Sequence, residues 1–583
     1  MLQYESGPIW LAYVAAVLIS VFISSVTIYT WQTPRDRSLF VTSIAVISLA
    51  ALLATVLLLP VDIAIISSTT DNALGVKKKW ATPKRVDEIV NTLHIVYYTM
   101  YSLDALLCLI VIPFGYFWYE EYDEFEIEEG RPLRSRIWAT FKHTLGFVLL
   151  VAILLVLGYF LPSTTELHNR HISAIGLDKV LTFCIGAMLA IGTLLYVVYT
   201  GIGLARLPIS MIRSSPSLAA PSFAAATSAA LARNRSRQRQ LELRNASRLS
   251  YKDRRELEHL VREERTLVRR QRLSEEAQGF RKSWIQRTFC NFAKVLKHLR
   301  LLGGLVMLAM ALFMWASMLI TGIDKGTNLA CKGRCGYVLE RLRLYQPLNA
   351  FFVWAAGFFP VDYVLLTLLV LLLFAASISG VSTIGIRFLW VRIFQVRRGH
   401  TAPQALLITT VMLAMMILAI NYSLVAMIAP QYALYGTQMV CTASTANPLG
   451  CIGQPELIVP CTTIEVHQGN SVCTPSVIST FINKIIITWP LFGAIEFWSQ
   501  FGFMGVFVLA LFVTCVRGPR LNLSQVDEDA EEDEEERLLA RSPEEYGGTW
   551  ADISGRARSK NSSPSSSNAE RVSQAEESRS SHV

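Results

Sequence analysis

The chain has 583 residues, of which 52% are hydrophobic and 17% are charged, and its mean hydropathy is +0.39. Soluble domains average about 25% charged residues, and the apolar residues here fall in runs of about 20, the length that spans a bilayer. This composition excludes a soluble protein and predicts an all-α, polytopic membrane protein whose partner is the lipid bilayer. The formal net charge of +9 is no argument for nucleic acid, because the excess is concentrated in one loop that would face anionic headgroups.

Nine apolar segments are predicted to be transmembrane helices. They occupy 9–31, 39–66, 89–118, 143–161, 178–204, 301–321, 361–386, 404–430 and 486–516. The predicted organisation is therefore five spans in 1–204, a basic loop at 205–301, four spans in 302–516 and a tail at 517–583.

The loop at 205–301 fixes the expected orientation. It holds 22 Lys and Arg against 8 Asp and Glu, and basic residues beside apolar segments mark the cytosolic side of a membrane. Nine spans then place the N-terminus in the lumen and the C-terminus in the cytosol. The segment 67–88 opposes this bias, because it carries several lysines, including Lys77, but falls on the lumenal side.

Two parts of the basic loop differ in composition. Residues 214–232 are rich in Ser, Ala and Pro and are expected to be flexible. From 233 to 276 the composition favours helix, with apolar residues near helical spacing. A solvated charged helix, a helical hairpin that docks a partner and a helix lying on anionic headgroups remain open alternatives.

Six of the ten cysteines fall between spans on the expected lumenal side. They are Cys331 and Cys335 after the sixth span, and Cys441, Cys451, Cys461 and Cys473 after the eighth. An even set of cysteines in an oxidising compartment indicates disulfides, with chance clustering as the alternative. No metal site is expected, because no histidine lies near the short CKGRC spacing.

The tail is acidic and then Ser-rich, a composition typical of disorder. Within it, residues 534–539 read EEERLL. Glu534, Leu538 and Leu539 fit the acidic-dileucine address that sorts membrane proteins to lysosomes or vacuoles and is read by a receptor. A chance match in an acidic tail is the alternative.

Polar residues inside the predicted spans are the candidate transport residues. They are Asp62, His94, Tyr97, Tyr101, Asp104, Asn421 and Glu496. In the third span Tyr97, Tyr101 and Asp104 fall at i, i+4 and i+7 and therefore share one helix face. An intramembrane charge must be paired or face water, which favours a polar route or a substrate cavity. Structural contacts that lock helix pairs together are the alternative.

No enzyme signature is present in the sequence. The patterns GxxxxGK[ST], HExxH and GxSxG are all missing, so the chain is expected to be neither a P-loop ATPase nor an enzyme. No catalytic residues and no catalytic cofactor are therefore assigned, and any transport is expected to be secondary or driven by a partner.

Four motifs point to a known family. LLLPVDI in the second span, YTGIGLARLPISMI at the end of the fifth, GFFPVDY before the seventh and APQYALYGTQ after the eighth resemble the limb-region-like family. This family includes the lipocalin-interacting membrane receptors, and the resemblance covers about residues 1–520. The motifs do not indicate which residues would contact a ligand.

The resemblance implies a nine-span protein of the lysosomal or vacuolar membrane that exports cobalamin (vitamin B12) to the cytosol. It also implies a lysosomal ABC transporter as a partner, which would supply an ATP-driven step. The alternative is a receptor or trafficking adaptor that transports nothing and binds a partner membrane protein through its basic loop.

Overall fold

The computed structural model describes the following residues: 7–33, 38–121, 133–159, 176–213, 221–244, 251–279, 284–328, 337, 344–358, 360–388, 391–397, 399, 401–442, 451, 457–461 and 472–517. The chain forms two compact units. The first consists of Met1–Ser215 and Ser283–Arg520, and the second of Pro216–Lys282 and Leu521–Val583.

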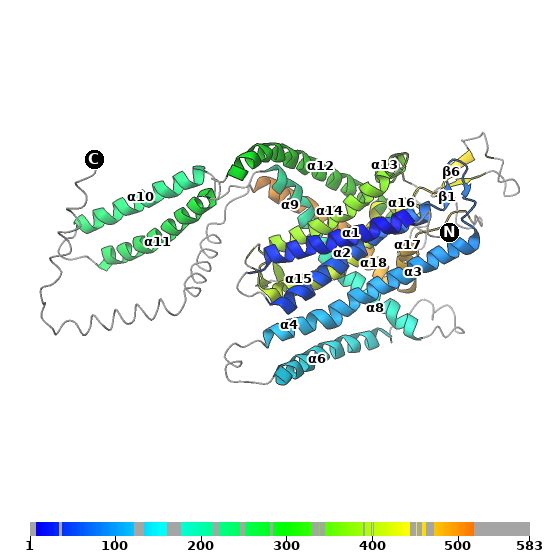
Figure 1. Ribbon diagram of the computed structural model, residues 1–583, viewed down its shortest axis with the longest axis horizontal. Helices are drawn as coiled ribbons and strands as arrows, with labels where there is room; N and C mark the ends of the chain where they lie inside the picture. Colours follow the sequence, from blue (N-terminus) through cyan, green and yellow to red (C-terminus); the bar gives the residue numbers. More distant parts are fainter. Residues whose placement is uncertain are drawn as a thin grey trace, which may run out of the picture. The chain divides into compact units, whose positions relative to one another are not determined.

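The first unit is a helical bundle (Figure 1). Its first half contains α1 (Gly7–Trp31), α2 (Leu39–Ser67), α3 (Pro83–Leu106), η1 (Leu107–Val111), α4 (Ile112–Glu120), α6 (Leu133–Tyr159), α8 (Gly176–Leu195), η2 (Tyr196–Thr200) and α9 (Gly201–Ile212). Its second half contains α12 (Trp284–Asn328), α13 (Pro347–Ala355), α14 (Val361–Ile384), α15 (Pro403–Ser423), η4 (Leu424–Ile428), α16 (Pro430–Tyr435), α17 (Val477–Thr488) and α18 (Pro490–Val516). The elements η1, η2 and η4 are π-helical turns inside longer helices.

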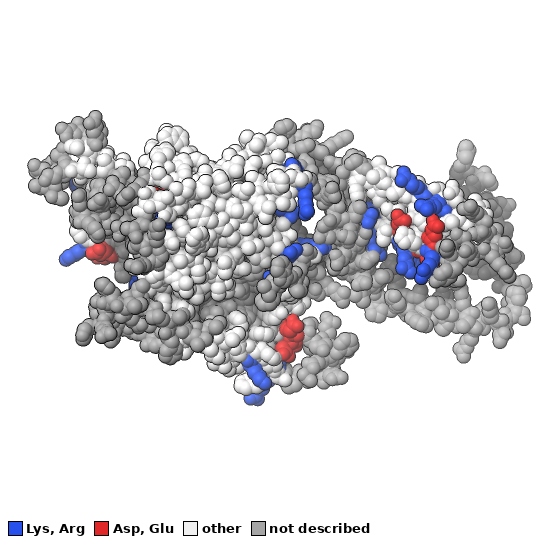
Figure 2. All heavy atoms as spheres, turned by 180° about the vertical axis from the view of Figure 1, so that it is seen from behind, with Lys and Arg blue, Asp and Glu red and all other residues white. Residues whose placement is uncertain are grey.

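Nine helices of the described residues are long and apolar enough to cross a membrane. The prediction of an all-α polytopic protein with nine spans is therefore confirmed. α2 and α15 are the most buried of the nine and contact each other at the centre, while α1 lies along α2. On the face drawn in Figure 2, charged side chains of the bundle gather toward its ends and leave a broad uncharged surface between them.

The described residues include three antiparallel hairpins outside the helices. They are β1 (Thr70–Asp71) with β2 (Val76–Lys77), β3 (Ile386–Phe388) with β4 (Val391–Phe394), and β5 (Met439–Cys441) with β6 (Ile458–Pro460). Disulfides join Cys441 to Cys451 and Cys461 to Cys473 beside the third hairpin. This end of the bundle is called the disulfide-bearing end below. Cys331 and Cys335 lie outside the described residues, as do Glu534, Leu538 and Leu539 of the tail.

Several predicted boundaries are wrong. The helix of the fourth span, α6, begins at Leu133 rather than at 143. The helix of the seventh span, α14, ends at Ile384 rather than at 386, because Gly385 adopts a positive φ of 74°. The predicted ninth span is broken at Trp489, because Pro490 starts a new helix and has no N–H to continue the old one.

The second unit contains the helical hairpin of α10 (Pro221–Arg244) and α11 (Tyr251–Gly279). The predicted flexibility of 214–232 is wrong for 221–232, where the alanine-rich run forms the first turns of α10. Leu231 and Leu260 are buried within the hairpin, and Arg235 Nε lies 2.7 Å from Glu264 Oε1 across it. Residues 233–276 therefore belong to a helical hairpin, and its docking to a partner stays a prediction.

Candidate functional site

Asp62 is fully buried near the end of α2 and holds the start of another helix. Its carboxylate accepts backbone N–H groups from Val477 at 3.4 Å and from Ile478 at 3.1 Å, both in the first turn of α17. Tyr97 donates its hydroxyl to the same carboxylate at 3.3 Å. The free N–H groups and the positive dipole end of a helix stabilise a carboxylate at this position. Both oxygens of Asp62 are therefore occupied.

The polar face of α3 continues inward from Asp62. Tyr97 stacks on Tyr101 with ring centroids 5.9 Å apart, and Asn421 of α15 donates its amide to the Tyr101 hydroxyl at 3.2 Å. One turn further, Asp104 accepts the hydroxyl of Thr55 at 2.8 Å, whereas its Oδ1 has no donor among the described residues. These six residues, from Asp62 to Asp104 with Asn421 and Thr55, form the first polar cluster, which joins α2, α3, α15 and α17.

A cavity of about 630 Å³ opens at the disulfide-bearing end beside this cluster. Lys77, Asp87, His94, Cys473 and Val477 are among the residues that line it. Because Val477 also donates its N–H to Asp62, the cavity adjoins the first cluster. His94 thus lies in the cavity wall and makes none of the hydrogen bonds of that cluster.

Lys77 is the most buried cation of the cavity wall. Its ammonium group donates to Thr69 Oγ1 and to Thr474 Oγ1, each at 2.7 Å. Burial lowers the pKa of Lys77 from 10.5 to about 8. The segment 67–88 is expected to be lumenal despite its lysines. Lys77 has a structural reason to be there, because it connects this segment to Thr474, next to the disulfide-bonded Cys473.

Glu496 of α18 belongs to a separate, second polar cluster. Its side chain is 0% exposed, and its Oε1 accepts the hydroxyl of Thr193 at 2.6 Å. Glu496 Oε2 and Gln500 Oε1 have no donor among the described residues. Both residues line an internal cavity of about 10 Å³ together with Thr193, Tyr196, Met318, Tyr422 and Ser423. Lys325 of α12, only 3% exposed, places a buried cation in the same part of the bundle.

The π-helical turns adjoin both clusters. η1 begins three residues after Asp104, η2 begins with Tyr196, and η4 follows Ser423, whose hydroxyl lies 3.0 Å from the Tyr196 hydroxyl. In η4 the carbonyl of Met427 accepts the hydroxyl of Thr321 at 2.8 Å. Such turns change the local hydrogen-bonding register of a helix and occur frequently at functional sites.

Three of the four family motifs meet in space near the disulfide-bearing end. Tyr432 of APQYALYGTQ donates its hydroxyl to Asp362 of GFFPVDY at 2.8 Å. Gly436 of APQYALYGTQ has a φ of +59° and packs closely on Ser67 of α2. A Cβ added at Gly436 would lie 2.0 Å from Ser67 Oγ. Each Pro-Val-Asp copy thus places a buried aspartate against a tyrosine hydroxyl, although Asp62 lies late in α2 and Asp362 lies in the first turn of α14.

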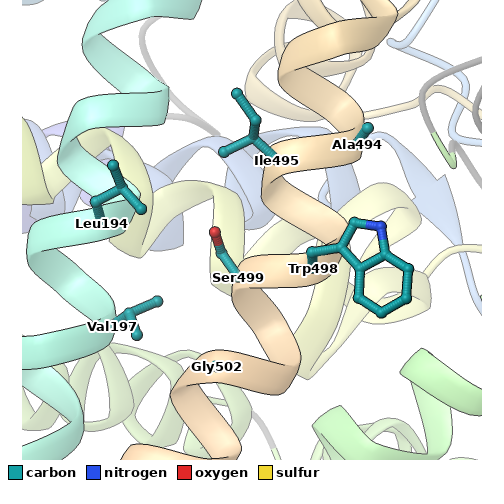
Figure 3. A pocket seen from close by; sticks show the side chains of 7 residues that line it. All are labelled: Leu194, Val197, Ala494, Ile495, Trp498, Ser499 and Gly502. Carbon is teal, nitrogen blue, oxygen red and sulfur yellow. The ribbon is translucent and has the colours of Figure 1, made fainter.

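A groove of about 470 Å³ runs between α8–η2 and α18 on the membrane-spanning surface (Figure 3). Leu194, Val197, Ile495 and Trp498 give it apolar walls, and the Ser499 hydroxyl lies between the two helices. The groove shares Val197 and Ser499 with the small cavity beside Glu496. Its lining suits a lipid acyl chain, and its place brings the membrane surface close to the second cluster.

Sequence reasoning missed two important members of the second cluster. The predicted sixth span stopped at 321, so Lys325 fell outside it, whereas α12 continues to Asn328. Gln500 lies one turn after Glu496, and that i, i+4 spacing could have identified it. Among the described residues, no group of three or more His, Cys, Asp or Glu side chains is arranged to hold a metal ion.

The nine spans, the intramembrane carboxylates and the disulfide-bonded loop define a polytopic α-helical membrane protein. Residues 9–300 match the family described as "LMBR1-like membrane protein". The chain belongs to this family, which confirms the family resemblance.

Relatives extend the match to nearly the whole chain. A "Probable lysosomal cobalamin transporter" of Podospora anserina is 51% identical over 574 residues, or 96% of each chain. Proteins with the same name are 51% identical in Sclerotinia sclerotiorum, over 97% of each chain, and 48% identical in Aspergillus terreus, over 96% of this chain and 99% of the relative. No solved structure matches the chain.

Proposed function

We propose that this chain is a multi-pass protein of the lysosomal or vacuolar membrane that exports cobalamin from the lumen to the cytosol. One observation carries the proposal: 51% identity over 96% of both chains to a relative named as a probable lysosomal cobalamin transporter. The match covers nearly the whole length of both chains. The proposal assigns the chain no covalent chemistry, in keeping with the absence of enzyme motifs from its sequence.

The geometry supplies a starting point for such transport. The cavity at the disulfide-bearing end, about 630 Å³, lies within the range of pockets that hold drug-sized ligands. Cobalamin is larger than such ligands, so this conformation would accept only part of it, such as an edge of the corrin ring or the nucleotide arm. Inward of the cavity lie Asp62, Tyr97 and Tyr101, which we assign to the transport path together with Asn421.

The proposed orientation places the disulfide-bearing end in the lumen. Disulfides persist in oxidising compartments, and the basic loop at 205–301 favours the cytosol. The N-terminus would then be lumenal, and the loop and the tail cytosolic. Maleimide labelling of intact organelles checks this: Cys441, Cys451, Cys461 and Cys473 should react only after reduction and unfolding, and full labelling without reductant would contradict the arrangement.

The central experiment is uptake of radiolabelled cobalamin into proteoliposomes that contain this chain alone. We expect uptake above that of protein-free liposomes, with no ATP and no partner protein. Uptake only when an ABC transporter is added would move the energy-coupled step to that partner. No uptake in either case would contradict the proposed function.

A further inference from the structure

Glu496 is a fully buried carboxylate of the membrane-spanning bundle whose hydrogen bonds are incomplete among the described residues. An ionised carboxylate in the middle of a membrane is costly unless its oxygens are hydrogen-bonded and its charge is paired. Thr193 satisfies one oxygen of Glu496 at 2.6 Å, and the other oxygen has no donor among the described residues. Glu496 Oε2 therefore lacks a hydrogen-bond donor in the described part of the chain.

The side-chain amide oxygen of Gln500 also lacks a donor among the described residues, and Gln500 lines the same cavity as Glu496. Gln500 lies one turn along α18 from Glu496 and is 1% exposed. Both side chains line the internal cavity of about 10 Å³, which is close to the space of a single water. A proton on Glu496 Oε2 converts that oxygen into a donor. It could then serve Gln500 Oε1, directly or through one water molecule.

The other two candidate carboxylates do not offer this arrangement. Asp62 accepts three hydrogen bonds and holds the start of α17, which is a structural task. Asp104 has one oxygen without a donor, but it lines none of the three cavities described above.

The ionisable groups around Glu496 make its charge state consequential. The helices packed on α18 contribute several ionisable groups. They are Asp324 and Lys325 of α12, Tyr196 of η2, Cys184 of α8, Lys484 of α17 and Arg213 directly after α9, and Tyr422 of α15 lines the cavity. Arg213 donates to the carbonyl groups of Thr514 and Cys515 at the far end of α18. Lys325 is the cation whose charge acts on Glu496. Protonation of Glu496 therefore removes a buried negative charge that acts on Lys325.

Two π-helical turns form part of the wall of this cavity. Tyr196 and Val197 belong to η2, and Met427 belongs to η4. A change in charge at Glu496 thus acts directly on the places where α8–α9 and α15–α16 depart from regular helical bonding. A ligand shifts a conformational equilibrium only if it interacts differently with the two states, and a proton that changes the local charge meets this condition.

We propose that Glu496 is the proton-binding group that couples cobalamin export to proton movement. It lies six residues into α18, about 9 Å along the helix from the N-terminal end at Pro490. In the proposed orientation that end faces the acidic lumen. Glu496 would take up one proton from the lumen, forming the neutral acid, and release it to the cytosol in the same cycle that moves cobalamin. This inference rests on the proposed function.

The test uses the full chain in proteoliposomes loaded with a pH-sensitive dye. Two quantities are measured: exchange of labelled for unlabelled cobalamin at equal pH, and the change in internal pH when a cobalamin gradient is imposed. We expect the wild-type protein to show both. Glu496→Gln should keep exchange and lose the pH change down to the level of protein-free liposomes, because the amide cannot carry the proton.

Two variants keep the outcome interpretable. Glu496→Asp retains an acid and should retain both activities. Glu88→Gln makes the same chemical change at an exposed carboxylate, which lies 3.2 Å from Arg85, and should also retain both. Cobalamin movement by the wild type with no pH change overturns the coupling, as does a pH change that persists in Glu496→Gln or exchange without a pH change in Glu496→Asp. Absence of cobalamin movement by the wild type refutes the proposed function itself.

Discussion

Gly203 of α9 and Gly380 of α14 lie where two helix backbones touch. An added Cβ at Gly203 would lie 1.8 Å from the carbonyl oxygen of Ala376, and one at Gly380 would lie 1.8 Å from that of Tyr199. Neither obstacle is a flexible side chain. Alanine at either position therefore requires the helices to move apart by about 1 Å, since overpacked contacts relax only through backbone shifts. Small residues at helix interfaces in membranes permit this kind of close approach.

We expect Gly203→Ala and Gly380→Ala each to lower the free energy of unfolding by about 2–4 kcal/mol. Overpacking costs about 1–3 kcal/mol, and separation also weakens the buried hydrogen bond between the hydroxyls of Thr200 and Ser377, 2.7 Å apart, by about 1 kcal/mol. Thermal unfolding in detergent, followed by size-exclusion chromatography, measures the effect.

Matched controls lie on other membrane-spanning helices. A Cβ at Gly146 or at Gly505 would meet no atom within 4 Å. Their alanine variants should be neutral or stabilised by up to about 1 kcal/mol, through helix propensity alone. Equal melting temperatures for all four variants would refute the reasoning, because the cost is assigned wholly to the two backbone contacts.

Four further outcomes are expected. Asp62→Ala should lower the free energy of unfolding by about 1–2 kcal/mol, as loss of a helix cap does, and a melting temperature equal to that of the parent would contradict the capping role. Burial lowers the pKa of Lys77 to about 8, against 10.5 for a free lysine, so the unfolded chain binds this proton more tightly than the folded chain does. The free energy of unfolding of the parent should therefore rise between pH 8 and pH 10.5 relative to that of Lys77→Met. The same pH dependence of the melting temperature in parent and variant would argue against this. Asp104→Asn should retain cobalamin export from organelles, whereas Asp104→Leu should lower protein abundance by removing the acceptor for Thr55; export lost at parental abundance in the Asn variant would assign Asp104 to transport. Replacing Leu538 and Leu539 by Ala should redirect the protein to the plasma membrane in fluorescence imaging, and unchanged location would make EEERLL a chance match.

The membrane spans could be predicted from the sequence because their signal is local. A run of about 20 apolar residues is the shortest helix that crosses the hydrocarbon, so length and composition alone identify it. The errors fall where a helix continues or stops for another reason. Pro490 breaks the ninth span although the residues on both sides of it are apolar. Lys325 lies inside α12, which continues to Asn328, whereas the predicted sixth span ended at 321.

The polar stripe of α3 was predictable for the same reason, since the spacing of Tyr97, Tyr101 and Asp104 places them on one face of a single helix. Their partners were not predictable. Asp62 meets the start of α17, 415 residues further along the chain, and Glu496 meets Thr193, 303 residues before it. These contacts depend on how the helices pack, and hydropathy carries no information about that choice. The π-helical turns escape prediction too, because the residues in them are as apolar as the helices around them.

The packing of α15 connects the two polar clusters physically. Asn421 donates to Tyr101 in the first cluster, and Ser423, two residues later, contacts Tyr196 in the second. Two residues span about 200° around a helix of 3.6 residues per turn, so the two side chains point to nearly opposite sides. η4 follows directly, so that a change of register there would rotate both contacts together. Transport residues reached from the disulfide-bearing cavity and a proton on Glu496 could thus act on the same helix, which is what coupling between two sites requires.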